Sequence, residues 1–148
     1  MMVEVLVSLS IIVVSILAAM SVTEKSMAVS RQALHTAQSS FLLDEGAEAV
    51  RILRDGSWNN ISNLSVGTPY YLVFANGNWS LSATPSTVGN FTRTIIMSSV
   101  NRDANSSDIV VSGVNDPLTR LVTVNVSWNE SGQIKNKTLP FYIMDIFS

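Results

Sequence analysis

Glu4 is the residue near the N-terminus whose type and position point to chemistry. It precedes a 19-residue stretch without charge, Val5–Thr23, and it is the only charged residue among the first 22. An ionised carboxylate beside apolar sequence is costly in a membrane, so such a residue is a candidate for function. Two interpretations stay open: a carboxylate that reaches into the lipid headgroups, and one that binds a cationic partner in a water-poor environment.

Asparagines form the second candidate set, because eight of the 12 stand in the pattern N-x-S/T. With 32 serines and threonines in 148 residues, chance alone gives about 2.6 such sites (12 × 32/148). The pattern is the acceptor site of N-linked glycans on extracellular proteins. The alternative is an exposed sheet rich in asparagine and serine that carries no glycan. The eight positions are Asn60, Asn63, Asn78, Asn90, Asn105, Asn125, Asn129 and Asn136.

Metal and catalytic signals are weak. Asp103, Asn105 and Asp108 are spaced like half of a calcium loop, but the central glycine and the distal glutamate are missing, which favours a polar turn. His35 is the sole histidine and there is no cysteine, so a thiolate metal site is excluded. We therefore expect no enzymatic activity and no cofactor. A net charge of −2 argues against a dedicated nucleic-acid partner.

The N-terminal segment, residues 1–23, is a predicted membrane helix. Seventeen of the first 22 residues are apolar. As a helix, Val5–Thr23 is ~28 Å long, close to the ~30 Å hydrocarbon core of a bilayer. A cleaved secretory signal would need a basic segment before the run and a shorter apolar stretch. No Lys or Arg precedes the run, which favours an uncleaved anchor.

The helix is predicted to continue as an amphipathic segment over residues 24–56. It has no proline, its apolar residues recur every seven residues, and it ends at Arg54-Asp55-Gly56. A helix of about 54 residues is ~80 Å long, whereas the remaining chain makes a body only ~25–30 Å across. The first half of the apolar stripe must therefore be covered by lipid or by other chains. The stripe consists of Met20, Met27, Leu34 and Phe41, widened by Ala37, Leu42, Ala49, Val50 and Leu53.

Residues 57–148 have the period-two pattern of an antiparallel sheet. The Asn76-Gly77 pair predicts a tight hairpin, and the alternation of Val122, Val124, Val126 and Trp128 predicts one buried face. The expected strands cover residues 69–74, 79–83, 91–100, 118–128 and 133–146, the last with Pro140 at an edge or a bend. The end of the long helix is available to cover the buried face, so we predict an α+β fold.

The N-terminal motif Met1-Met2-Val3-Glu4-Val5-Leu6-Val7-Ser8-Leu9, continuing into a long amphipathic helix, resembles the type IV pilin and pseudopilin family. That resemblance implies helices packed in a filament core, with sheet domains outside. It also implies that Glu4 pairs with the methylated N-terminal amine of a neighbouring subunit, here that of Met1. The implied partners are identical subunits, the inner membrane before assembly, a prepilin peptidase and the pilus assembly machinery.

Three features depart from the family pattern. Three residues precede the glutamate instead of the usual four, and Met1 stands where the family commonly has N-methylated phenylalanine. No glycine or proline interrupts the helix before Gly46, so we expect it to be continuous. The paired cysteines that hold the C-terminal loop of many pilins are absent, so hydrogen bonds of the sheet must hold residues 133–148.

The first hypothesis for function is a structural subunit of an extracellular type IV pilus that serves adhesion, twitching motility or DNA uptake. One alternative is a minor pilin, or a pseudopilin of a type II secretion system. The other is a monomeric, membrane-anchored module whose sheet binds a surface ligand.

Overall fold

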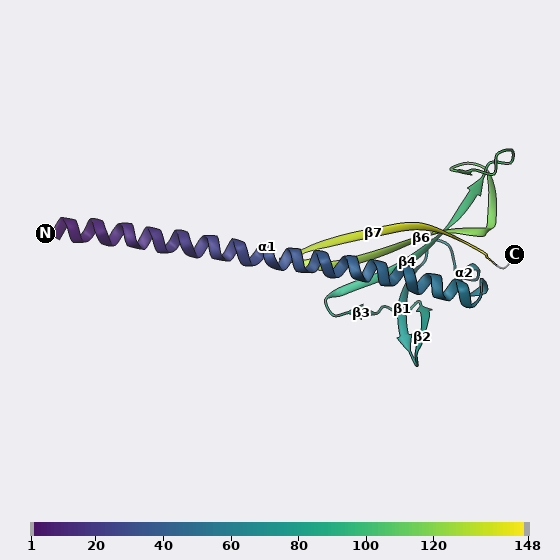
Figure 1. The fold of residues 1–148 in the computed structure, drawn as a ribbon, viewed down its shortest axis with the longest axis horizontal. Coiled ribbons are helices and arrows are strands. Elements are labelled where there is room, and N and C mark those ends of the chain that lie inside the picture. The colour runs from purple at the N-terminus through teal and green to yellow at the C-terminus, as the bar shows by residue number, and fades with distance from the viewer. Residues whose placement is uncertain (1, 147–148) are drawn as a thin grey trace. The chain divides into compact units, whose positions relative to one another are not determined.

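A computed structural model describes residues 2–146 of the chain. It contains a long helix, a short helix and a seven-stranded antiparallel sheet, so the predicted α+β fold is confirmed (Figure 1). The elements are α1 (Met2–Gly56), α2 (Asn59–Ser62), β1 (Pro69–Ala75), β2 (Asn78–Ser82), β3 (Thr87–Val88), β4 (Phe91–Arg102), β5 (Ile109–Val110), β6 (Val114–Glu130) and β7 (Gln133–Met144). Two compact units divide the chain, the first ending at Ala37 and the second beginning at Gln38.

The helix α1 ends at Gly56, as its sequence predicts, and is uninterrupted from Met2. The boundary between the compact units does not coincide with the change from helical to strand periodicity at residue 57. It falls at Gln38, because the last turns of α1 share a hydrophobic core with the sheet. The second unit therefore holds both a helical segment and all seven strands.

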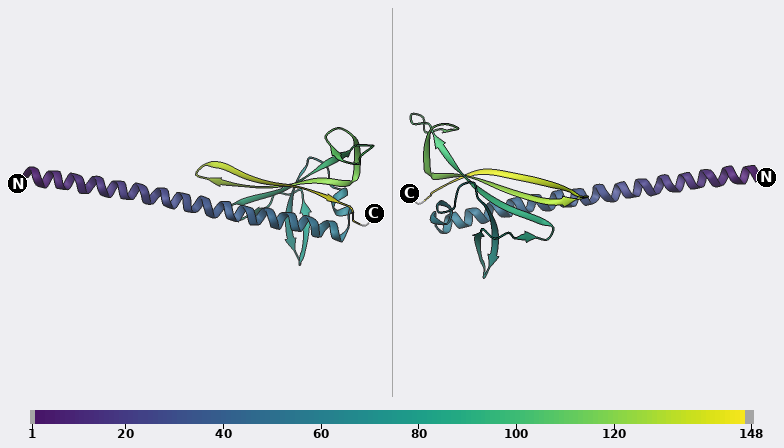
Figure 2. Two further views of the ribbon diagram at one scale, coloured as in Figure 1. Left: turned by 45° about the horizontal axis from the view of Figure 1, so that its top comes forward. Right: turned by 180° about the vertical axis from the view of Figure 1, so that it is seen from behind.

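The sheet of the second unit has the strand order β2-β1-β4-β6-β7, with β3 and β5 also paired to β4. All pairs are antiparallel, and β7 is an edge strand that contains Pro140, as expected for a residue without an N–H donor. At the β1–β2 hairpin, Asn76 and Gly77 have φ values of 54° and 79°, which confirms the tight turn. Figures 1 and 2 show this hairpin and the β4–β6 connection on opposite sides of the unit.

One face of the sheet, here called the inner face, packs on the last turns of α1. Val122, Val124 and Val126 of β6 are fully buried there, as their alternation predicts. Helix residues Ala49 and Val50 meet this face and are also buried. At Gly46 the two layers are so close that a Cβ atom would lie 2.8 Å from Val124 Cγ1. The glycine therefore sets how closely the helix approaches the sheet.

A buried arginine also joins the helix to the inner face. Arg93 of β4 is only 4% exposed, forms an ion pair with Glu45 and donates to the Leu42 carbonyl oxygen over 3.2 Å. Its guanidinium lies 5.6 Å from the ring centroid of Trp79. A buried charge that lost its partner would be strongly destabilising, so this cluster ties the sheet to one position along the helix.

The spacing of residues along α1 would allow Arg51 to pair with Asp55 as well as with Glu48. Asp55 instead pairs with Arg54 at 2.7 Å, while Arg51 pairs with Glu48, as its spacing predicts, and lies over the Phe141 ring. The guanidinium of Arg51 is drawn towards β7, because an aromatic face on the sheet offers a second attraction. The spacing of residues along the helix could not predict the contact with Phe141, because that ring lies on β7.

The connection between β4 and β6 is held by a polar cluster. Asp116 accepts hydrogen bonds from Thr119 Oγ1 and from Arg102 Nε, both over 2.6 Å, and Arg102 also donates to the Ser107 carbonyl oxygen over 2.9 Å. The Thr119 hydroxyl and the Arg102 guanidinium lower the pKa of Asp116 to about 2. The cluster fixes the base of a loop that continues into β5.

Replacing Asp116 with asparagine tests this cluster through its pH dependence. A carboxyl whose pKa is lowered by folding stabilises the fold above its unfolded pKa, near 3.8, and loses that contribution as pH falls towards 2. We therefore expect Asp116→Asn to melt at a lower temperature than the wild type at pH 6. The difference between the two should close between about pH 4 and pH 2. A difference that is constant across this range contradicts a charged role for Asp116.

Candidate functional site

The first unit is a helix with an exposed apolar surface. Its large apolar side chains from Met2 to Leu34 are between 47 and 84% exposed. Over the most apolar 18-residue window of α1 the mean hydropathy is 2.7, and no part of that window is buried. Each such side chain gains about 1.5–3 kcal/mol when it leaves water. A surface of this kind needs lipid or protein around it.

Three hydroxyl groups within the apolar helix donate hydrogen bonds to the helix itself. Ser10 donates to the Leu6 carbonyl oxygen and Ser15 to that of Ile11, each over 2.7 Å, and Thr23 donates to that of Ala19 over 2.9 Å. These bonds reduce the cost of placing a hydroxyl in hydrocarbon. α1 is the one helix, among the described residues, that is long and apolar enough to cross a membrane.

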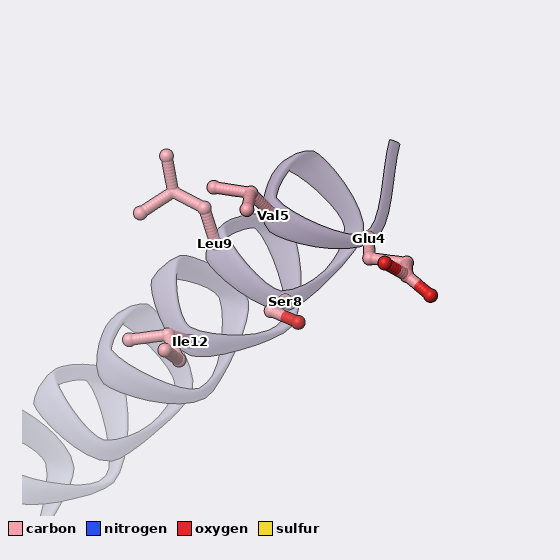
Figure 3. Close-up of a pocket in the computed structure, with 5 residues that line it drawn as sticks. All are labelled: Glu4, Val5, Ser8, Leu9 and Ile12. Carbon is pink, nitrogen blue, oxygen red and sulfur yellow. The ribbon is translucent and has the colours of Figure 1, made fainter. Parts of the chain in front are cut away.

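Glu4 lies in the first turns of α1 and is exposed. Figure 3 shows its carboxylate projecting from the helix on the same side as the Ser8 hydroxyl, whereas Val5 and Leu9 point the other way. Together with Ile12, these residues line a shallow, mostly apolar patch on the helix surface. A carboxylate at the border of an apolar patch is suited to an ionic contact that becomes dry when the patch is covered. Met1, the proposed source of the amine, lies outside the described residues.

The seven-residue stripe proves to be an exposed line of side chains. Met20 and Met27 are each 57% exposed, Leu34 is 55% exposed and Phe41 is 74% exposed. Phe41 belongs to the second unit, yet it does not join the core of that unit. The stripe was predicted to widen through Ala49 and Val50. Ala49 and Val50 are buried under the sheet, as expected for the last turns of the helix, but the exposed Phe41 does not share that buried face.

Two different faces of α1 carry the apolar residues of the second unit. One face packs on the sheet through buried residues such as Leu43, Ala47 and Val50. At 100° per residue, Phe41 lies on the opposite side of the helix, and so does Ile52, which is 56% exposed. Ile52 was not singled out from the sequence, although its spacing of 11 from Phe41, about three helical turns, places both on one line.

The sequence-predicted asparagines lie in the second unit. Seven of the eight are exposed, and Asn125 is half-buried in the middle of β6. The weak cation loop is a hydrogen-bonded turn: Asp103 Oδ1 accepts from the backbone N–H groups of Asn105 and Ser106 over 2.8 and 3.0 Å. Asp108 lies at the far end of this turn, where its carbonyl oxygen accepts from the Asp103 N–H over 2.9 Å.

His35 is half-buried within the last turns of the first unit. Among residues 2–146, no group of three or more histidine, aspartate or glutamate side chains is placed to hold a metal ion. The surfaces that remain as candidates for function are therefore the apolar helix with Glu4, the line through Phe41 and Ile52, and the exposed asparagines.

Comparisons with known proteins identify no relative of this chain. No protein-family profile, no curated protein and no solved structure matches this chain. A proposal about function must therefore rest on the geometry of the chain itself.

Proposed function

We propose that this chain is a structural subunit of a type IV pilus or a related pseudopilus. Its apolar helix anchors it in the inner membrane before assembly. The same helix then leaves the lipid and packs against the helices of identical subunits in an extracellular filament. Such a filament would serve adhesion, motility or DNA uptake, or secretion in the case of a pseudopilus.

The observation that carries this proposal is the length of exposed apolar helix in the first unit. Met2–Ala37 is ~54 Å long at 1.5 Å per residue, whereas a bilayer core is ~30 Å thick and takes up about 20 residues. Past that length, Met27, Val29 and Leu34 are still 55 to 65% exposed. Lipid cannot cover both ends of this helix at once, so protein partners are needed.

Identical chains are the simplest partners for such a helix. The exposed line runs from Met20 to Phe41 with a period of seven, which is the spacing that lets helices pack along their length. In a bundle of copies, each line is buried by an equivalent line of a neighbour. Exchange of lipid for helix costs little in apolar contact, because both environments are equally dry.

Glu4 supplies what apolar packing lacks, which is a fixed axial register. An apolar helix can slide along another with small losses, but a carboxylate in a dry bundle is tolerated only opposite a cation. The family resemblance assigns that cation to the terminal amine of the adjacent subunit. One ion pair per subunit would then set the rise of the filament.

Removal of residues 1–25 tests the role of the first unit. We expect the shortened chain to be a soluble, folded monomer, because the second unit has its own core. It should be absent from filaments when it is produced beside the full-length chain. The readouts are sedimentation of the purified fragment, and electron microscopy with mass spectrometry of surface filaments.

The opposite outcome would favour an anchored binding module. In that case the full-length chain would remain a monomer in detergent, and the cells would carry no filaments that contain it. The fragment would also keep any ligand that the full-length chain binds. A filament subunit has no reason to show this behaviour.

A further inference from the structure

The structure divides the eight N-x-S/T asparagines into two groups of four. In the first group the side-chain amide takes part in the fold. Asn60 donates to the Leu53 carbonyl oxygen at the end of α1 over 2.9 Å, and Asn125 donates to Thr94 Oγ1 over 3.5 Å. Asn78 donates to the Asn76 carbonyl oxygen, and Asn129 accepts from the Gly132 N–H.

In the second group the side chains are exposed, and their amides have no hydrogen-bond partner among the residues that the structure describes. This group consists of Asn63, Asn90, Asn105 and Asn136. Asn63 follows α2, Asn90 precedes β4, Asn105 lies in the turn between β4 and β5, and Asn136 lies on the edge strand β7. An enzyme could therefore reach each of these amides without breaking a bond of the fold.

We propose that these four asparagines carry N-linked glycans. The reaction is transfer of an oligosaccharide from a lipid-phosphate or lipid-pyrophosphate donor, catalysed by a membrane transferase. A bond forms between Nδ2 of the asparagine and C1 of the first sugar, and the bond from C1 to the donor phosphate oxygen breaks. The amide loses one proton, and the lipid phosphate leaves with the electron pair of the broken bond.

The alternation of polar residues along an exposed strand accounts for fewer than half of the eight motifs. Along a strand, residues i and i+2 share a face, so a polar face rich in asparagine, serine and threonine produces N-x-S/T by alternation. Asn78, Asn125 and Asn136 lie in strands together with the Ser or Thr of their motif, where this operates, whereas Ser131 of the Asn129 motif lies in the turn after β6. Outside the strands, four of six asparagines are in the motif, against about 1.3 by chance (6 × 32/148).

The sheet face opposite α1 gives the modification a physical use. From Thr92 to Ser98 in β4, from Leu121 to Asn129 in β6 and from Ile134 to Tyr142 in β7, no outward position is Asp, Glu, Lys or Arg. Ile134, two residues from Asn136 on the same face, is 79% exposed. A charge-free face beside an edge strand invites pairing between sheets, and a hydrated glycan on that strand opposes it.

This inference does not depend on filament assembly. It requires only that the second unit lies on the non-cytoplasmic side of a membrane, where such transferases act. The experiment is therefore the intact mass of the full-length chain, purified from the cells that produce it, followed by mapping of modified peptides. We expect a mass above that of the bare polypeptide, with glycan on Asn63, Asn90, Asn105 and Asn136 and none on Asn125.

Matched variants of one site sharpen this test. Thr138→Ala destroys the motif of Asn136 and should lower the mass by one glycan. Thr138→Ser keeps the motif and should retain the glycan, while Asn125→Gln should leave the glycan mass unchanged. The mass of the bare chain, or glycan confined to the asparagines whose amides are used by the fold, overturns the proposal.

Discussion

We expect Glu4→Gln to abolish filament formation while the chain still inserts in the membrane and its second unit stays folded. Glutamine keeps the shape of the side chain but removes the negative charge. In the proposed filament, the variant would therefore leave the amine of the neighbouring subunit without a counter-ion in a dry helix bundle. Breaking a buried ion pair by removal of one partner costs about 3–5 kcal/mol. At ~1.4 kcal/mol per factor of ten, each added subunit would bind on the order of a hundred- to several thousand-fold more weakly.

Insertion in the membrane should not suffer, because an uncharged side chain enters hydrocarbon more easily than a carboxylate. The matched control is Glu24→Gln, a carboxylate beyond the uncharged stretch Val5–Thr23, which should assemble as the wild type does. Filaments are counted by electron microscopy, and membrane and filament fractions are compared for each variant. Normal filaments from Glu4→Gln would refute the assigned role of the carboxylate.

The second large effect is expected at Gly46, where the helix meets the sheet. A Cβ atom there would lie 2.8 Å from Val124 Cγ1 and 3.2 Å from Arg93 Cδ. Val124 is fully buried in the middle of β6 and cannot move aside without displacing its neighbours. Leucine at this position should therefore separate the helix from the sheet. Overpacking of this kind costs about 1–3 kcal/mol, and the accompanying strain on the Arg93–Glu45 pair adds to it.

Helix propensity works in the other direction, since replacing glycine inside a helix gains about 1 kcal/mol. We expect the overpacking to win for Gly46→Leu, with a net loss of roughly 1–2 kcal/mol and a drop in melting temperature of roughly 4–8 °C. Gly46→Ala should fall between this variant and the wild type. Circular dichroism of the chain without residues 1–25 measures the transition.

Gly56 supplies the matched control for this series. A Cβ atom at Gly56 would meet only Asn60 Nδ2, at 3.7 Å, which is an ordinary contact. Gly56→Leu should therefore melt close to the wild type. If Gly46→Leu is as stable as Gly56→Leu, the close approach of the helix to the sheet does not limit stability.

Local signals were sufficient for most of the fold. The uninterrupted helix, the Asn76-Gly77 hairpin and the alternating face of β6 depend on the conformation and polarity of neighbouring residues, which a sequence shows directly. The short elements α2, β3 and β5 were not predicted. Ile61 of α2 is held by burial in a core built from residues distant in sequence. The strands β3 and β5 pair with nearby residues of β4, but at two residues each they are too short to show a period-two pattern.

The candidate site, like the fold, was only partly predictable from local sequence signals. Glu4 and the apolar helix were found from composition, since a lone charge beside an apolar run is visible without any fold. The exposure of Phe41 was not predicted from composition, because it depends on which side of the amphipathic helix packs against the sheet. That choice is made at Gly46, where a Cβ atom would come too close to Val124, and by the ion pair between the buried Arg93 and the half-exposed Glu45, which are 48 positions apart.

The sequence by itself therefore determined that a long apolar helix joins an antiparallel sheet, and that a single carboxylate stands near its start. These properties follow from the periodicity and polarity of residues that are neighbours along the chain. Only the tertiary structure decided which helix face stays exposed and which asparagine amides the fold uses. Both depend on contacts between residues far apart in sequence, whose distances no local pattern encodes.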